Sequence, residues 1–425
     1  MRLALTLALL AAPVAAQTFT VAPSGGDFTQ IQAAIDAAPP GATVLVAAGQ
    51  YDPFVLSKPL TILGEGSGLV RVGDWLSSTN GGSAVEQLPA GASARISGFE
   101  FRVAQCSALS QALGLCVGAE GAPLRVVASS GVVVLHDVVV DWSDVWDSAF
   151  FGDALRVTDA SLVIVDRARL GTFKILKDTA AIRAVRSTLW IGDSVLQGGS
   201  GTGNFPWPAG AGFGGTEAVH LEDSVLYAAR SSFYGGGPGA YEDLFGQVHT
   251  IPGGSGIVAE ASALKLVGGP ASVIDGAVDL IVEDGSFALV GAGWSGPETV
   301  IADASSLVDL AAAHYPTLRF VARSVAPGGA TTLQIAGAPG SLVRTFGSFD
   351  VSAPFALAGV DGAVAISLGA LVVLPPVALG PQGDASVPIA VPSGIGDLLL
   401  HVQALAMSPS GELALSNPAS LAILQ

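Results

Sequence analysis

The chain between residues 124 and 269 repeats one short pattern of apolar and polar positions. Each copy has apolar or small residues on both sides of a central position, and an apolar anchor follows six positions later. The copies are centred on Arg156, Arg183, His220 and Val258, with anchors Leu162, Leu189, Leu226 and Leu264, and a looser copy is centred on Arg125. The anchors are 27, 37 and 38 residues apart (162 to 189, 189 to 226, 226 to 264). A short unit between loops of different length buries its apolar side only by stacking on its copies, so the pattern predicts a parallel β-helix.

The segments on either side of the repeats have other patterns. Residues 29–38 carry apolar side chains at helical spacing, and Thr29 and Gln32 have the spacing of a capping box. A helix there would cover the apolar end of the stack, which otherwise presents an unpaired edge. From Pro316 onward, short strands recur at the distances typical of a sandwich. We expect a β-helix over residues 17–315 and a small, sandwich-like all-β domain over residues 316–425.

The N-terminal region resembles that of a known family. Gly25-Gly26-Asp27-Phe28, the helical segment and Gly49-Gln50-Tyr51 occur in this order. The stretch from Thr20 to Glu65 is similar to the N-terminal turn of right-handed β-helix proteins of the pectin-lyase-like superfamily, which includes pectinesterases. The resemblance implies a right-handed, exported β-helix with a capping helix. Pectinesterases have glutamate where this chain has Pro53, and their glutamine motif and paired aspartates are not found, so the resemblance does not extend to esterase activity.

The first sixteen residues predict a secretory signal peptide. Arg2 precedes an apolar run from Leu3 to Leu10, and small residues precede Gln17. We expect no membrane span after its removal, because the most apolar later stretch, residues 370–379, contains Pro375 and Pro376. The location implied is extracellular or in the cell envelope. The sequence carries no signal for the oligomeric state.

The net charge narrows the classes of binding partner, and the cysteine content predicts a disulfide. The net charge of −17 argues against nucleic acid and anionic lipid, which bind basic surfaces. Cys106 and Cys116 are the two cysteines, and in an exported protein a pair this close predicts a disulfide.

A basic column is the first candidate site. Arg125, Arg156, Arg183 and His220 occupy equivalent positions between core-facing neighbours, so we expect them on one exposed line about 4.8 Å apart. Three positions further along, Asp159, Arg186 and Asp223 alternate in sign. The alternative is an ordinary solvated sheet face, in which these aspartates pair with the neighbouring arginines.

Loops between the strands supply the other candidates. Asp141, Asp144 and Asp147 could ligate Ca²⁺, and Trp142 and Trp146 could stack sugar rings, although the spacing matches no known calcium loop. Trp207 and Tyr241 lie in two further aromatic loops, residues 198–216 and 235–255. The alternative is that these are solvated or self-packed loops.

Two functions of different class follow. The first is a secreted, non-catalytic protein that binds a polysaccharide or a cell-surface glycan and requires no cofactor. The second is an enzyme acting on an acidic glycan, such as a lyase with an arginine of the column as base and Ca²⁺ as cation. The first is favoured because nucleophile, zinc and phosphate-loop motifs are missing.

Overall fold

The computed structural model describes residues 17–73, 82–102, 122–140, 152–172, 179–200, 215–242, 247–267, 272–290, 294–295, 299–309 and 316–424. The predicted signal peptide, Cys106, Cys116 and the Asp141–Asp147 segment lie outside these ranges. Among the described residues, no helix has the length and apolar character needed to cross a membrane.

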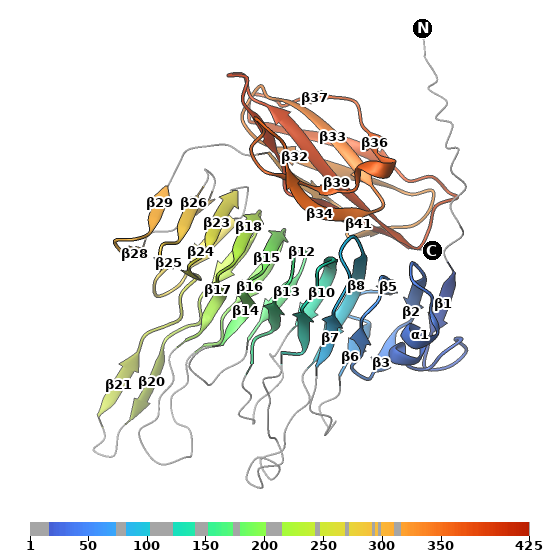
Figure 1. The fold of residues 1–425 in the computed structure, drawn as a ribbon, viewed down its shortest axis with the longest axis horizontal. Coiled ribbons are helices and arrows are strands. Elements are labelled where there is room, and N and C mark those ends of the chain that lie inside the picture. The colour runs from blue at the N-terminus through green and yellow to red at the C-terminus, as the bar shows by residue number, and fades with distance from the viewer. Residues whose placement is uncertain are drawn as a thin grey trace.

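The chain is almost entirely β, and its larger part consists of parallel sheets (Figure 1). One sheet has nine strands, each paired in parallel with the corresponding strand of the next repeat. Its strands are β4 (Val55–Leu56), β7 (Ser83–Glu86), β9 (Leu124–Val127), β11 (Leu155–Thr158), β14 (Ala180–Val185), β17 (Glu217–Glu222), β22 (Ile257–Glu260), β25 (Leu280–Glu283) and β28 (Val300–Ala302).

The second parallel sheet has eighteen strands in two ladders that join at β8 (Ser93–Phe101) and β10 (Val132–Val140). One ladder comprises β1 (Thr18–Val21), β2 (Thr43–Val46), β5 (Thr61–Gly64), β12 (Leu162–Asp166), β15 (Thr188–Gly192), β18 (Val225–Ala229), β23 (Ala263–Val267), β26 (Phe287–Val290) and β29 (Leu307–Asp309). The other comprises β3 (Gly49–Tyr51), β6 (Val70–Val72), β13 (Arg169–Gly171), β16 (Val195–Gln197), β19 (Ser232–Tyr234), β24 (Ser272–Asp275) and β27 (Trp294–Ser295). Side chains from all these ladders form one apolar core between the sheets.

Buried serines connect the turns between the two sheets. The amide of Ser187 donates to Ser224 Oγ (3.1 Å), that of Ser224 to Ser262 Oγ (3.0 Å), and that of Ser262 to Ser286 Oγ (2.8 Å). Each turn also contains a residue with positive φ, such as Asp159 (52°), a conformation that aspartate tolerates better than most residues. The turn positions predicted to alternate in charge, Asp159, Arg186 and Asp223, all have this backbone conformation.

One predicted anchor is wrong. Leu189, Leu226 and Leu264 are in register, but the residue paired with Leu189 is Val163 rather than Leu162. The turn after β11 is one residue longer than the turn after β14, so Leu162 faces outward. It remains buried, in a separate cluster with Trp190 and residues of the C-terminal sheets.

The helix α1 (Ile31–Ala37) forms without the predicted capping box. Its N-cap is Gln30, and no side chain caps its first turn. Gln30 Oε1 instead accepts a hydrogen bond from Asp52 N (3.1 Å), and Gln32 Oε1 accepts one from Val55 N (2.7 Å). These glutamines join the helix to the next strand segments, while Ile31, Ala34 and Ile35 enter the core.

The strands after residue 316 pair mainly antiparallel and form sheets of their own. The three-stranded sheet has the order β30 (Thr317–Phe320), β32 (Ala330–Ala336), β38 (Asp384–Ala390). The seven-stranded sheet contains β31 (Ser324–Val325), β33 (Leu342–Ser348), β36 (Val372–Val373), β37 (Val377–Ala378), β39 (Leu398–Met407), β40 (Leu413–Leu415) and β41 (Ala419–Ile423), and β34 (Val351–Ala356) pairs with β35 (Ala363–Ile366). A 3-10 turn, η1 (Leu368–Ala370), precedes β36.

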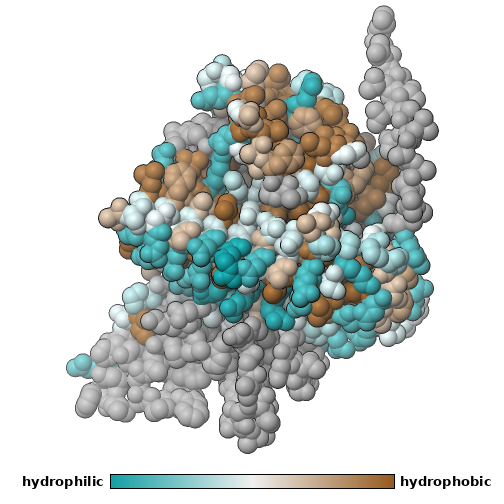
Figure 2. All heavy atoms as spheres, in the orientation of Figure 1, coloured by the Kyte–Doolittle hydropathy of each residue, from teal (hydrophilic) through white to brown (hydrophobic). Residues whose placement is uncertain are grey.

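These C-terminal sheets have a separate core and pack beside the parallel sheets (Figure 1). On the face shown in Figure 2, apolar atoms gather over this part, whereas polar atoms predominate over the parallel sheets. Exposed apolar side chains of the C-terminal part include Leu368 and Val373. The domain boundary at residues 315 and 316 stays a prediction, although parallel pairing gives way to antiparallel pairing between β29 and β30.

Candidate functional site

Four basic side chains line up across the nine-stranded sheet. Arg125 of β9 is paired in register with Arg156 of β11, Arg156 with Arg183 of β14, and Arg183 with His220 of β17. Their strand neighbours, such as Leu155 and Val157, are fully buried. The four basic residues are half-buried and point to the other side of the sheet. Strand spacing places successive side chains about 4.8 Å apart.

The half of the column around Arg183 is neutralised by carboxylates. Arg183 Nε lies 3.4 Å from Asp153 Oδ1, and its Nη1 lies 3.2 Å from Glu222 Oε1. His220 Nε2 lies 3.4 Å from Glu222 Oε1 and 3.7 Å from Glu260 Oε1. Among the described residues, Arg183 therefore pairs with Asp153 and Glu222 rather than with Asp159 or Asp223.

Asp153 is a buried carboxylate at the base of this half. It accepts a hydrogen bond from Ala180 N (2.9 Å), which ties β14 to the residue ahead of β11. Burial raises the pKa of Asp153, and the charges of Arg183 and, less strongly, Arg156 oppose that rise. Asp153 therefore belongs to the framework under the column rather than to a solvated acidic loop.

The other half of the column has no such partners. Within the part of the chain that the structure describes, neither Arg125 nor Arg156 lies within 4.0 Å of a carboxylate oxygen, and Arg125 Nε is buried without a hydrogen-bond partner. The outward positions two residues further along these strands hold Val127 and Thr158, which are uncharged. Two adjacent guanidinium groups repel each other, so this half favours a bound anion.

An acidic row follows the column at its other end. Glu222, Glu260 and Glu283 are in register on β17, β22 and β25. Burial raises the pKa of Glu260, and the negative charges of Glu222, Asp284 and Glu283 raise it further. The outer face of the sheet is therefore basic over β9 and β11 and acidic over β22 and β25.

Two of the charged turn residues expected beside the column, Asp159 and Arg186, form an ordinary surface ion pair. Arg186 Nε and Nη2 donate to the two carboxylate oxygens of Asp159 at 2.6 and 2.9 Å. Both side chains are exposed. The alternative of simple surface pairing therefore describes this pair, but it does not describe Arg125 and Arg156.

Most loop candidates lie outside the described residues. These are Asp141, Trp142, Asp144, Trp146, Asp147 and Trp207, so the calcium and stacking predictions stay predictions. Tyr241 lies in β20 (Gly239–Glu242), opposite His249 of β21 (Val248–Ile251). The segment expected to be a loop contains this antiparallel hairpin. Among the described residues, no group of three or more histidine, cysteine or acidic side chains is arranged to hold a metal ion.

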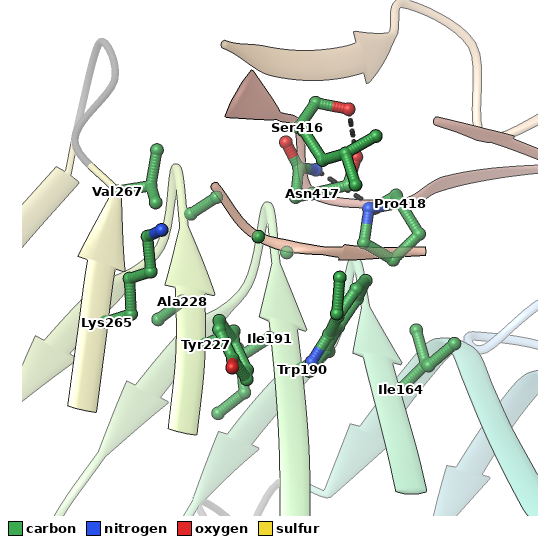
Figure 3. Close-up of a pocket in the computed structure, with 15 residues that line it drawn as sticks. Ile164, Trp190, Ile191, Tyr227, Ala228, Lys265, Val267, Ser416, Asn417 and Pro418 are labelled. Atoms are coloured by element: carbon green, nitrogen blue, oxygen red, sulfur yellow. Dashed lines mark hydrogen bonds between the residues drawn. The ribbon is translucent and has the colours of Figure 1, made fainter. Parts of the chain in front are cut away.

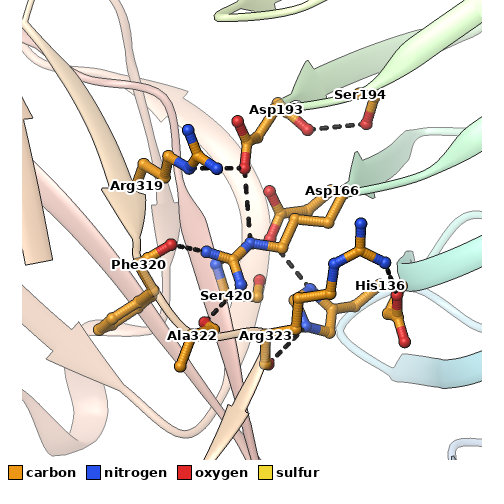
Figure 4. A network of polar contacts seen from close by, with 12 residues as sticks. His136, Asp166, Asp193, Ser194, Arg319, Phe320, Ala322, Arg323 and Ser420 are labelled. Atoms are coloured by element: carbon orange, nitrogen blue, oxygen red, sulfur yellow. Dashed lines mark hydrogen bonds and ion pairs between the residues drawn. The ribbon is translucent and has the colours of Figure 1, made fainter. Parts of the chain in front are cut away.

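A polar network that the sequence analysis missed joins the parallel sheets to the C-terminal sheets (Figure 4). Asp166 Oδ2 accepts from Ser420 N (2.9 Å) and lies 3.0 Å from His136 Nδ1, and all three residues are buried. His136 Nε2 lies 3.3 Å from the carbonyl oxygen of Arg323. The only sequence signal was the recurrence of charged residues at one turn of successive repeats.

A pocket lies beside this network, between β12, β15, β18 and β23 and the segment Ser416–Pro418 (Figure 3). The space among its lining residues is about 450 Å³, including its open mouth. Trp190 and Tyr227 contact edge to face on its floor, with ring centroids 5.4 Å apart. Lys265 forms an ion pair with Asp361 at its side.

Comparisons with known proteins add little to these observations. No protein-family model matches the chain, and no curated protein is significantly similar to it. Among solved structures, the chain is similar to Spo0M, a sporulation control protein from Bacillus subtilis, at 8% sequence identity and a TM-score of 0.17. The match covers 27% of this chain and 51% of that chain, about half its length. A likeness this weak carries no argument about fold or function.

Proposed function

We propose that the protein is a secreted, right-handed parallel β-helix that binds an acidic polysaccharide, without cleaving it, along Arg125, Arg156, Arg183 and His220. The observation that carries the proposal is the pair Arg125 and Arg156, which have no carboxylate partner among the described residues. In a chain of net charge −17, two adjacent arginines with no carboxylate oxygen within 4.0 Å in the described part of the chain need an explanation. A bound anion supplies one.

The sheet topology supports the β-helix part of the proposal. Most repeats supply one strand to the nine-stranded sheet and two to the larger sheet, and each strand pairs in parallel with its counterpart in the next repeat. A chain that winds in this way forms a solenoid with a continuous core. The signal-peptide pattern of residues 1–16 supports export.

Arginine geometry favours a carboxylate-bearing glycan as the ligand. The planar guanidinium group donates two parallel hydrogen bonds to a carboxylate. Consecutive arginines follow the strand spacing of about 4.8 Å, close to the length of one hexopyranose unit. A polyuronate lying across the strands would therefore present acidic groups at a spacing similar to that of the column. The tryptophans Trp142, Trp146 and Trp207 would supply stacking surfaces from the connecting loops.

Replacement of Arg156 tests the proposal. The variant Arg156→Ala should bind a polyuronate at least about tenfold more weakly, because one charge-assisted hydrogen bond contributes about 1.5–3 kcal/mol. Added salt should weaken binding by the wild type. Calorimetric titration with a polyuronate and with a neutral glucan measures both effects.

The matched control is Arg71→Ala, which removes the same charge from the larger parallel sheet, where Arg71 pairs with Glu100 (3.4 Å). This variant should bind as the wild type does. Equal binding of the acidic and neutral polysaccharides, or unchanged binding by Arg156→Ala, would contradict the proposal.

The raised pKa of Glu260 predicts how binding depends on pH. Because Glu260 takes up its proton at a higher pH than an ordinary glutamate, lowering the pH toward about 4 neutralises it early. Loss of this negative charge near His220 favours an anionic ligand. The variant Glu260→Gln should therefore bind more tightly than the wild type at neutral pH, and the two should converge as the pH falls. A constant difference across the pH range would show that Glu260 does not act through its charge.

A polysaccharide lyase is the second candidate, because Arg183 and His220 lie beside carboxylates on the same face. An arginine of the column would act as base and Ca²⁺ would acidify the α proton of a uronate. The non-catalytic proposal predicts no new unsaturated ends when a polyuronate is incubated with the protein and Ca²⁺. Ultraviolet absorbance of the product distinguishes the two functions.

A further inference from the structure

A second stack of charged residues occupies the turns that face the C-terminal sheets. Asp137, Arg167, Asp193 and Arg230 follow β10, β12, β15 and β18 or lie within them, at the same turn of successive repeats. All four have positive φ, between 47° and 57°. Their charges alternate along the stack, so each would neutralise its neighbours if nothing else were present.

The first three residues of the stack bind the C-terminal part. Asp137 Oδ1 pairs with Arg323 Nη1 (2.6 Å). The guanidinium group of Arg167 donates to the carbonyl oxygens of Phe320 and Ala322. Asp193 Oδ2 lies 3.2 Å from Arg319 Nε and 3.6 Å from Arg167 Nε (Figure 4). These contacts fix the turn against β30 and the residues after it.

Arg230, the fourth residue, has no side-chain partner within the described part of the chain. Only 8% of its surface is exposed, yet none of its nitrogens forms a hydrogen bond or an ion pair among the described residues, and its Nε is buried. Burial lowers its pKa; the charge of Asp193 opposes this, whereas Arg319 and Arg167 lower it further. A guanidinium group held in this way is unfavourable unless something compensates its charge.

The local balance of charge is positive. Arg167 and Arg319 pair with Asp193, and the charge of Asp193 also acts on Arg230. The charge of Asp166 acts on both Arg167 and Asp193. Asp166 forms hydrogen bonds with His136 and Ser420, and Asp137 pairs with Arg323. Three arginines (Arg167, Arg230 and Arg319) beside two aspartates (Asp166 and Asp193) leave one positive charge for a ligand to neutralise.

We propose that Arg230 and Arg319, with Arg167 behind them, bind a tetrahedral oxyanion, a phosphate or sulfate group. An oxyanion neutralises the excess positive charge, and its several oxygens can accept from two guanidinium forks at once. The Arg319 side chain is 42% exposed, and Gly192 and Ala229, which precede Asp193 and Arg230, line the pocket of Figure 3, so solvent reaches one side of this turn. The anion would bridge β18 of the parallel sheets and β30 of the C-terminal sheets.

Calorimetry with sodium sulfate and with sodium phosphate, at ionic strength held constant with sodium chloride, tests the site. The wild type should bind one oxyanion per chain. Arg230→Ala should weaken binding at least tenfold, and Arg230→Lys should weaken it less, because lysine keeps the charge but loses the fork. Arg71→Ala, an arginine on β6, should bind as the wild type does.

Arg319→Ala keeps the test decisive if Arg230→Ala does not fold, because 42% of the Arg319 side chain is exposed and its loss leaves the core intact. It should also weaken binding about tenfold. No saturable binding by the wild type, or unchanged affinity in both Arg230→Ala and Arg319→Ala, would overturn the proposal.

A second titration, with a sulfated oligosaccharide and its desulfated form, distinguishes a free ion from a sulfate group carried on a glycan. Tighter binding of the sulfated sugar than of free sulfate, lost in Arg319→Ala, would assign the site to a modified glycan. Equal or weaker binding would assign it to the free ion. The column variant Arg156→Ala should keep its oxyanion binding, which separates this site from the proposed polysaccharide surface.

Discussion

Replacement of Asp166 by alanine should lower the free energy of unfolding by about 3–5 kcal/mol, because two buried hydrogen-bond donors lose their acceptor at about 1–3 kcal/mol each. The Asp166 side chain is 3% exposed and that of His136 is fully buried. Without this carboxylate, His136 Nδ1 and the amide of Ser420 lose their acceptor inside the interface. Urea denaturation followed by circular dichroism measures the change.

Asp159→Asn is the control for this prediction, because asparagine removes the charge and still tolerates the positive φ of this turn. Asp159 also pairs with a basic residue of the next repeat, Arg186, but both side chains are exposed. Solvent replaces a lost partner there, so stability should change little. A similar loss in both variants would mean that the Asp166 network does not hold the C-terminal part to the parallel sheets.

The sequence predicted the basic column well because the signal for it is local and periodic. Side chains alternate between the two sides of a strand, so core-facing Leu155 and Val157 determine where Arg156 points. Equivalent positions in successive repeats then pair in register, as Arg156 and Arg183 do. No knowledge of distant contacts was needed.

The anchor Leu162 shows where the same reasoning fails. A single extra turn residue moves a side chain to the opposite face of a strand. The sequence pattern alone did not reveal that the turn before Leu162 is longer than the turn before Leu189. Leu162 is apolar because the C-terminal sheets cover it, so its hydrophobicity gave a misleading signal.

The residues of the proposed oxyanion site and the Asp166 network could not be predicted to meet for a different reason. Asp166 and Ser420 are 254 residues apart, and Arg167 and Phe320 are 153 residues apart. Local patterns indicate which residues form strands and turns, but not which surface of one part meets another. The carboxylates that pair with Arg183 illustrate the same limit over a shorter range. Arg183 is on β14, whereas Asp153 lies before β11 in the preceding repeat and Glu222 lies on β17 in the following repeat.

The aromatic cluster near the N-terminal end predicts the second large loss of stability. Phe54 is 1% exposed, and its ring centroid lies 6.4 Å from that of Phe99 and 6.1 Å from that of Phe101. Phe99 and Phe101 are themselves stacked, with centroids 5.9 Å apart. Phe54→Ala should therefore lower the free energy of unfolding by about 3–5 kcal/mol, because the core around the lost ring cannot close completely.

A smaller change and an exposed control separate cavity formation from general effects of losing an aromatic residue. Phe54→Leu should cost clearly less than Phe54→Ala, since most of the volume remains filled. Phe287→Ala removes an aromatic ring that is 42% exposed at the start of β26, near the other end of the same sheets, and should cost much less. Urea denaturation of the three variants should find Phe54→Ala the least stable, with Phe54→Leu and Phe287→Ala both clearly more stable. If Phe287→Ala were as unstable as Phe54→Ala, the stability of the stack would depend on its C-terminal repeats rather than on the phenylalanine cluster.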